Sequence, residues 1–168
     1  MKIVIRRMQP DDLSQVVAIE NRWSYLSKWG EAGYRAVMSD PRVYTCFVAE
    51  DTEAPPGSAS IAGLAVMAQL IDDGELCNIV VVPEYVSKHV GSSLLQACVT
   101  AAQYFRISRM LLEVRQSNHR AIEFYKRKGF RIISERKNYY LNPRESAWVM
   151  ERAVKGAGRA ASKKAIEG

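Results

Sequence analysis

Apolar and polar positions follow two different rhythms along this chain, and the changes between them outline its secondary structure. Continuous or alternating apolar runs bounded by turn residues predict β-strands. The first four are residues 2–6, 43–50, 61–71 and 75–82. Turn sequences separate the last three strands: Ala54-Pro55-Pro56-Gly57 follows one, and Asp72-Asp73-Gly74 predicts a hairpin turn before the last.

Helical spacing of apolar residues marks most of the other segments. The clearest helix is predicted at 91–105, where one face carries an apolar stripe. The stripe consists of Leu94, Leu95, Cys98, Ala101, Ala102 and Phe105. A helix should also begin at Pro10, because Asp11 and Asp12 suit a helix N-terminus. The remaining predictions are helices at 31–38 and 120–128 and strands at 110–115, 130–137 and 147–152.

The order of these elements is strand, two helices, three strands, helix, strand, helix and two strands. It predicts an α/β fold in which about seven strands form a mixed sheet and four helices cover it. The strand–helix–strand unit at 75–115 should be parallel, with a right-handed crossover. Ligands of such units bind at the carboxyl ends of the strands, which here lie near Val82 and Arg115.

Composition is that of one ordinary globular domain: 168 residues, of which 48% are apolar and 25% charged. Apolar runs stay well short of the ~20 residues of a membrane span, and the N-terminus lacks the apolar core of a signal peptide. We therefore expect a cytoplasmic protein. The three cysteines, Cys46, Cys77 and Cys98, show no paired spacing, so neither a disulfide framework nor a metal site is expected.

The net charge of +6 is concentrated toward one end of the chain. Residues 153–168 carry four basic residues and one acid, and they are rich in alanine, glycine and serine. This composition predicts a flexible basic tail after a folded domain at 1–152. Its charge favours an RNA-rich partner such as the ribosome, although a solvated tail without function remains an equally simple interpretation.

Residues 111–130 carry the clearest chemistry. An apolar strand ends at Glu113, and the helix that follows brings Tyr125 back toward it. A carboxylate and a phenol that face one cleft can accept one proton and donate another, which is typical of a transferase. The alternatives are structural: Glu113 can pair with Arg115 or face solvent, and Tyr125 can pack in the core beside Ala121.

Four segments together resemble the GNAT N-acetyltransferases, and within them the RimI type, which acetylates protein N-terminal amines. They are CNIVVVPEY at 77–85, the helix from Gly91, LLEVRQSNHRAIEFYKRKGF at 111–130 and RKNYY at 136–140. The resemblance covers residues 2–152. It implies the GNAT acyl-CoA N-acyltransferase fold, with a splayed parallel strand pair near the sheet centre. It also implies acetyl-CoA as cosubstrate, no metal, and a protein N-terminus, such as that of a ribosomal protein, as acceptor.

By the same resemblance, Glu113 is the general base and Tyr125 the general acid of a direct attack. An α-amine has a pKa of ~7.7–8.0, so freeing it at pH 7 costs about 1.4 kcal/mol. A lysine amine, with a pKa of ~10.4, costs over ~4 kcal/mol. A carboxylate acting directly or through one water manages the former more readily.

The cofactor residues implied by the resemblance lie on a strand, a loop and a helix. They are Ile79, Val80 and Val81, whose backbone pairs with pantetheine; Ser87, Lys88, His89, Val90, Gly91 and Ser92, which receive the pyrophosphate; and Asn118. A helix-capping role for Asn118 is equally open.

The loop departs from the family pattern, which has a basic or amide residue where Val86 stands and glycine where His89 stands; only Gly91 remains. Losing a charge-assisted contact costs ~1.5–3 kcal/mol, or roughly 10- to 100-fold in affinity. A glycine-type backbone geometry at His89 adds about 1 kcal/mol of strain. Lys88 and a protonated His89 are the expected sources of compensating charge.

Acceptor-binding residues implied by the resemblance are Asn138, Tyr139, Tyr140 and Glu145. The alternative is that they form only the rim of a surface hairpin. Trp23, Tyr25 and Trp29 can form the opposite wall of the acceptor site or act as core anchors.

Two rival functions follow from the same residues. The fold can acetylate a small amine instead of a peptide. Alternatively, the altered loop no longer binds acetyl-CoA, and the chain is a non-catalytic module whose basic tail binds RNA.

Overall fold

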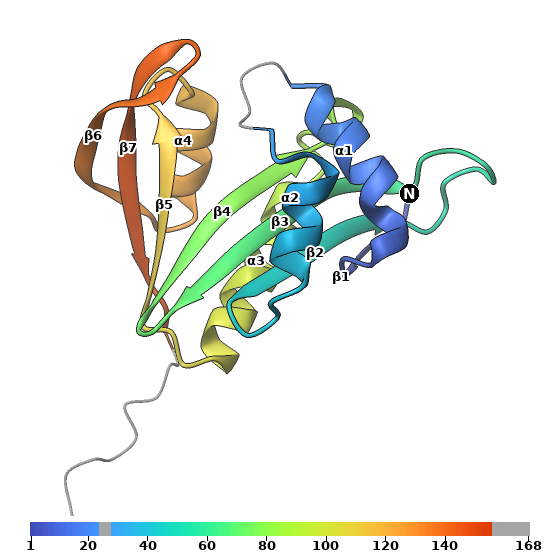
Figure 1. Cartoon of the computed structure of the whole chain (residues 1–168), viewed down its shortest axis with the longest axis horizontal. Coiled ribbons are helices and arrows are strands. Elements are labelled where there is room, and N and C mark those ends of the chain that lie inside the picture. The colour runs from blue at the N-terminus through green and yellow to red at the C-terminus, as the bar shows by residue number, and fades with distance from the viewer. Residues whose placement is uncertain (24–27, 156–168) are drawn as a thin grey trace, which may run out of the picture.

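The structure, a computed structural model, describes residues 1–23 and 28–155. Its strands form one seven-stranded sheet in the order β1-β2-β3-β4-β5-β7-β6 (Figure 1). The strands are β1 Ile3–Arg7, β2 Tyr44–Asp51, β3 Ile61–Leu70, β4 Asp73–Val81, β5 Arg109–Arg115, β6 Arg131–Leu141 and β7 Arg144–Ala153. Neighbours are antiparallel except β4 and β5, which confirms the predicted parallel unit.

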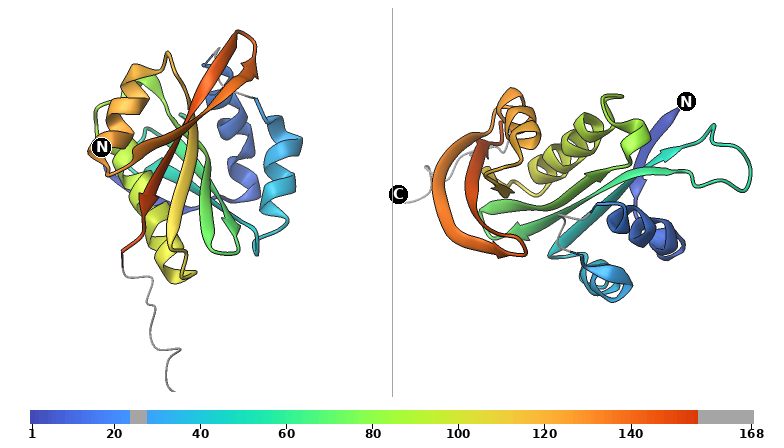
Figure 2. Two further views of the ribbon diagram at one scale, coloured as in Figure 1. Left: turned by 90° about the vertical axis from the view of Figure 1, so that its left-hand side faces the viewer. Right: turned by 90° about the horizontal axis from the view of Figure 1, so that it is seen from above.

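Four α-helices cover the sheet, as predicted. They are α1 Leu13–Asn21, α2 Gly30–Met38, α3 Val90–Tyr104 and α4 His119–Arg127, with short 3-10 turns at Pro10–Asp12 and Pro83–Tyr85. Figure 2, in its right-hand view, shows α1 and α2 on one face of the sheet and α3 and α4 on the other. The buried side chains form two hydrophobic clusters, one on each face of the sheet. The predicted fold class is therefore confirmed.

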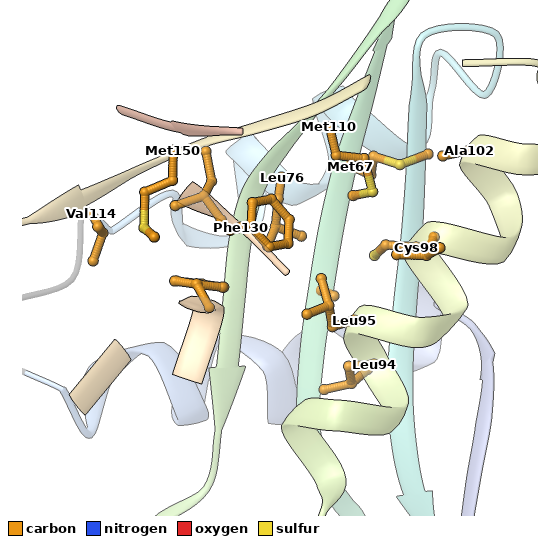
Figure 3. Close-up of a cluster of buried hydrophobic side chains, with 14 of the residues drawn as sticks. Met67, Leu76, Leu94, Leu95, Cys98, Ala102, Met110, Val114, Phe130 and Met150 are labelled. Carbon is orange, nitrogen blue, oxygen red and sulfur yellow. The ribbon is translucent and has the colours of Figure 1, made fainter. Parts of the chain in front are cut away.

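The larger cluster fixes α3 against the sheet, because the apolar stripe of the helix meets apolar strand residues (Figure 3). Leu94, Leu95 and Cys98 of α3 are fully buried and lie near Met67 and Leu76 of the strands. Burying a leucine side chain contributes ~1.5–3 kcal/mol. This packing holds the N-terminus of α3 at the carboxyl end of β4.

The parallel pair separates soon after it begins. β4 and β5 pair only from Asp73 to Glu75 on β4, and beyond that point they diverge (Figure 1). β4 also contains a bulge: Leu76 and Asn78 pair with adjacent residues of β3, which leaves Cys77 as the extra residue. The splay confirms the predicted arrangement. The bulge itself precedes the segment Ile79 to Val81.

Two sequence predictions were wrong in detail. The hairpin turn lies one residue earlier than Asp72-Asp73-Gly74, because Leu70 pairs with Asp73 and leaves a two-residue loop. The last two strands are longer than predicted. β6 is an edge strand whose residues are nearly all exposed, so its sequence carries little apolar alternation to reveal it.

The folded part extends beyond residue 152. β7 continues through Ala153, Val154 is buried, and the carbonyl of Lys155 accepts a hydrogen bond from Gln103 at 2.8 Å. The domain boundary therefore falls at least three residues later than predicted. The rest of the predicted tail, 156–168, lies outside the described residues. No helix in the described part of the chain is long and apolar enough to cross a membrane.

Candidate active site

A groove of about 540 Å³ runs between α3 and α4, at the carboxyl end of β4. Its floor is formed by Ile79, Val80 and Val81, which pair with β3 on one side only. Because β5 has already diverged, the other edge of this part of β4 has no β5 partner. An extended chain of amides can pair with such an edge as an added strand does.

The loop between β4 and α3 forms one wall of the groove. Ser87 and His89 have φ values of +67° and +64°, so the expected glycine-type geometry at His89 is confirmed. Gly91 leaves space in the groove: a Cβ there would lie 3.5 Å from Val81 and 3.8 Å from Phe124. The loop thus keeps the backbone path of a ligand-binding turn despite its sequence.

The N-terminus of α3 suits an anion. No side chain caps it, and its first turn carries no acidic residue. The first N–H groups of a helix have no partner within the helix, and the helix dipole favours negative charge there. Val90, Gly91 and Ser92 supply these groups and line the groove. A pyrophosphate fits this end of the groove chemically.

The cationic side chains of the groove lie on α4 and not on the loop. The ammonium of Lys88 sits 5.2 Å above the Tyr85 ring, and Lys88 does not line the groove. The geometry therefore gives no support to the expected compensating charge from Lys88. Arg120, Arg127 and Lys128 line the opposite wall instead.

Asn118 has the helix-capping role that was the alternative to cofactor contact. It is the N-cap of α4, and its side-chain oxygen accepts a hydrogen bond from the Ala121 N–H at 3.2 Å. It also lines the groove. Its contact with a cofactor stays a prediction.

Glu113 lies on β5 where this strand has left β4. Its side chain is largely buried and forms an ion pair with Arg136 at 3.2 Å, not with Arg115. The carboxyl of Glu75, on the neighbouring strand β4, lies near it. Burial raises the pKa of Glu113, the charge of Glu75 raises it further, and Arg136 lowers it. A raised pKa suits a base that must later release its proton.

Tyr125 combines packing with access to the groove. Its ring meets Phe124 and Phe130 edge-on, with centroids 5.3 and 5.7 Å apart, and the residue lines the groove. Burial raises the pKa of its hydroxyl, and the nearby Tyr140 adds to this. The phenol is therefore protonated at neutral pH and available as a donor. Burial raises the pKa of the Tyr140 hydroxyl to about 12, and the nearby charge of Glu113 adds to this.

Cys77, the bulge residue, lies close to both carboxylates. Burial, with the charges of Glu75 and Glu113, raises the pKa of its thiol to about 12. The thiolate is the nucleophilic form of cysteine, so this thiol is inert at neutral pH. A covalent acyl-cysteine intermediate at Cys77 is therefore disfavoured.

The Asn138-Tyr139-Tyr140 segment belongs to β6, not to a hairpin tip. Its pairing with β7 is interrupted here, and Asn138 has φ +52°. Arg136 lies over the Tyr139 ring at 5.4 Å, and Arg115 lies over the Tyr140 ring at 4.0 Å. The two tyrosines are thereby held edge to face on the strand.

Glu145 is occupied by structural contacts. It pairs with Arg115 at 3.2 Å and accepts a hydrogen bond from the Ser117 N–H at 2.5 Å. These partners lower the pKa of its carboxyl. It thus orders the end of β5 and supports Arg115 beneath Tyr140.

Trp23 and Trp29, the two tryptophans of the early segment, have different surroundings. Trp29 packs against Tyr34 at 5.5 Å, and its backbone N–H donates to the buried Glu20, as a core anchor does. Trp23 lines the groove. Tyr25 lies outside the described residues.

Sequence reasoning missed Glu75, Arg136 and the cationic wall of α4. Helical spacing carried a signal for the wall, because Arg120, Arg127 and Lys128 share one face of α4 with Phe124. The approach of Glu75 to Glu113 depends on the register of β4 and β5, which are far apart in the sequence, and leaves no local signal.

The structure thus has a groove at the mouth of a splayed parallel pair, with the Glu113 carboxyl on β5 and the Tyr125 phenol on α4, an arrangement that suits acyl transfer. The sequence model of the acetyltransferase (GNAT) family matches residues 11–130, and the chain belongs to this family of N-acetyltransferases. In Bacillus subtilis (strain 168), a protein named as a candidate ribosomal protein bS18-alanine N-acetyltransferase is 30% identical over 150 residues. That match covers 89% of this chain and 94% of the relative.

Solved structures agree with this family. The ribosomal-protein-S18-alanine N-acetyltransferase of Escherichia coli superposes with a TM-score of 0.80 and 26% identity, covering 95% of this chain and 99% of that one. The PaiA N-acetyltransferase of Thermoplasma acidophilum, solved with coenzyme A, has a TM-score of 0.72 at 19% identity, over 91% and 99% of the two chains. The second likeness concerns the fold alone.

Proposed function

We propose that this protein transfers the acetyl group of acetyl-CoA to the N-terminal α-amine of a protein, with a ribosomal protein as acceptor. One observation carries the proposal: β5 presents Glu113 just beyond its last residue paired with β4, and Tyr125 of α4 lines the groove at the carboxyl end of β4. The bS18-alanine acetyltransferases that resemble the chain support the choice of acceptor.

In the proposed complex, acetyl-CoA occupies the groove between α3 and α4. Pantetheine amides pair with the free edge of β4 at Ile79, Val80 and Val81. The pyrophosphate lies at the backbone of Ser87 to Ser92, with Asn118 close to the pantetheine. Backbone N–H groups of β4 polarise the thioester carbonyl.

The proposed reaction is a direct attack. The amine nitrogen bonds to the thioester carbon, Glu113 takes the proton that the amine loses, and the C–S bond breaks. Tyr125 gives its proton to the departing thiolate sulfur. Holding the two substrates together supplies much of the acceleration. The protonated state of Cys77 favours this route over a covalent intermediate.

The acceptor is proposed to enter from the face that carries α1 and α2. Asn138, Tyr139 and Tyr140 would contact its backbone and first side chain. Glu75 and Glu113 form a negative pair that attracts the α-ammonium. Glu145 acts here through Arg115, which it holds under the Tyr140 ring.

We further propose that the protein is cytoplasmic and has two parts, the acetyltransferase domain and the basic segment after it. The charge of that segment suits an RNA-rich acceptor complex such as the ribosome.

The first test is calorimetry with acetyl-CoA, followed by steady-state turnover of N-terminal peptides beside polyamines and other small amines. Saturable acetyl-CoA binding with turnover of peptides alone is the expected result. Turnover of small amines alone would assign the chain to the small-amine alternative. No binding at millimolar acetyl-CoA, with retained ribosome binding, would identify a non-catalytic module.

A further inference from the structure

The two walls of the groove are connected by one polar contact. Arg120, on the first turn of α4, donates a hydrogen bond from Nη2 to the Ser87 Oγ of the loop at 3.3 Å. Ser87 is one of the two loop residues with positive φ. The contact places a guanidinium at the loop end of the groove, next to the N-terminus of α3.

The loop itself brings no cationic side chain to this place. Val86 lines the groove with an apolar side chain, and Lys88 is engaged over the Tyr85 ring. Arg120 is exposed, and none of the ion pairs in the described part of the chain involves it. A guanidinium keeps its charge at every physiological pH. The charge that the loop lacks is thus available from the facing helix.

We propose that Arg120 binds the pyrophosphate of coenzyme A and replaces the basic residue that is missing at Val86. Its planar N–H donors match two phosphate oxygens at once, and the hydrogen bond to Ser87 orients it toward the loop. The inference rests on the proposed acetyl-CoA function.

A matched pair of variants tests the proposal. Arg120→Gln removes the charge and leaves a shorter, polar side chain, whereas Lys126→Gln removes a charge from the same helix outside the groove. Lys126 pairs with Glu123 and does not line the groove. Calorimetry with acetyl-CoA should show affinity roughly 10- to 100-fold weaker for Arg120→Gln. Lys126→Gln should change it less than about twofold. Arg120→Lys should give an intermediate affinity, because an ammonium keeps the charge but lacks the planar pair of donors.

A ligand series identifies the group that Arg120 binds. Dephospho-coenzyme A keeps the pyrophosphate and lacks only the 3′-phosphate, so Arg120→Gln should weaken it as much as it weakens coenzyme A. Acetyl-pantetheine has no phosphate, and the same variant should bind it as the wild type does. An equal loss for acetyl-pantetheine would show that Arg120 merely shapes the groove.

A second test restores the basic residue that is missing at position 86. Val86→Arg should restore most of the affinity in the Arg120→Gln background and add less in the wild type, because both side chains serve one anion. If wild type and Arg120→Gln bind acetyl-CoA equally, the Arg120 inference fails and the proposed function stands. If the wild type itself does not bind acetyl-CoA, the proposed function fails.

Discussion

The two ends of the groove differ in which features they share with the family pattern. At the reaction end, Glu113 and Tyr125 are the residue types that the resemblance implies, and burial raises the pKa of both groups. At the loop end, Val86 and His89 depart from the pattern that the resemblance implies, yet the backbone has left-handed turns and an uncapped helix N-terminus. Under the proposed function, side-chain types are retained where protons would move, and backbone geometry is retained where an anion would be held.

This difference has a physical basis. A proton can be exchanged only by a side chain with a suitable pKa, so a change of residue type ends the chemistry. A phosphate is satisfied by any correctly placed N–H groups and positive charge, and a facing helix can supply the charge. Substitutions at the two ends should therefore differ greatly in their effects.

The largest effect is expected from Glu113→Gln. The amide cannot take the proton, so kcat should fall ~10²–10⁴-fold while acetyl-CoA affinity stays unchanged. Steady-state kinetics and calorimetry measure the two quantities. Glu123→Gln, on the exposed side of α4, is the matched control and should have neither effect. Full activity of Glu113→Gln would remove the assigned base.

Tyr125→Phe should lower kcat by about 10²-fold, because the thiolate then leaves without its proton donor. The ring packing is kept, so the thermal midpoint should change little. Tyr104→Phe, at a position 81% exposed, serves as the control. A large loss of stability with unchanged kcat would assign Tyr125 to packing alone.

A moderate effect is expected from restoring the loop. Val86→Arg combined with His89→Gly adds a groove-lining cation and relieves a positive φ. Acetyl-CoA binding, measured by calorimetry, should tighten by up to about tenfold. Unchanged or weaker affinity would mean that the existing loop and α4 already satisfy the anion.

The smallest effects concern pH. In the proposed mechanism, activity requires ionised Glu113, so kcat/KM should fall as pH drops through the pKa of that carboxyl. Glu75→Gln removes a charge that raises this pKa, and the acidic limb should move to lower pH. Arg136→Gln removes a cation that lowers the pKa, so the limb should move to higher pH, although solvent screens this exposed arginine. The same acceptor peptide is used for every variant, so the titration of its α-amine contributes equally to each pH profile. Limbs that move in the same direction would contradict the assignment.

The sequence predicted those parts of the fold that depend on apolar periodicity. The stripe of α3 and the buried strands before it gave the parallel unit and the place of the groove. The edge strand β6 was underestimated, because a strand exposed on both faces needs no apolar alternation. The roles of Glu113 and Tyr125 were predicted from their local motif and stay a prediction.

Contacts between distant segments could not be predicted in the same way. Lys88 belongs to the loop but turns onto Tyr85, whereas Arg120 reaches the loop from another helix. Glu75 comes near Glu113 because β4 and β5 pair in parallel with Glu75 opposite Leu111. Each of these depends on tertiary geometry, which local residue patterns do not encode.

The central claim is that the reacting amine is a protein N-terminus. The most direct measurement is mass spectrometry of a peptide that begins with a free alanine and contains an internal lysine, after incubation with acetyl-CoA and the wild-type protein. We predict one acetyl group, located on the α-amine, and none with Glu113→Gln. Acetylation of the lysine ε-amine, or an unmodified peptide, would contradict this account.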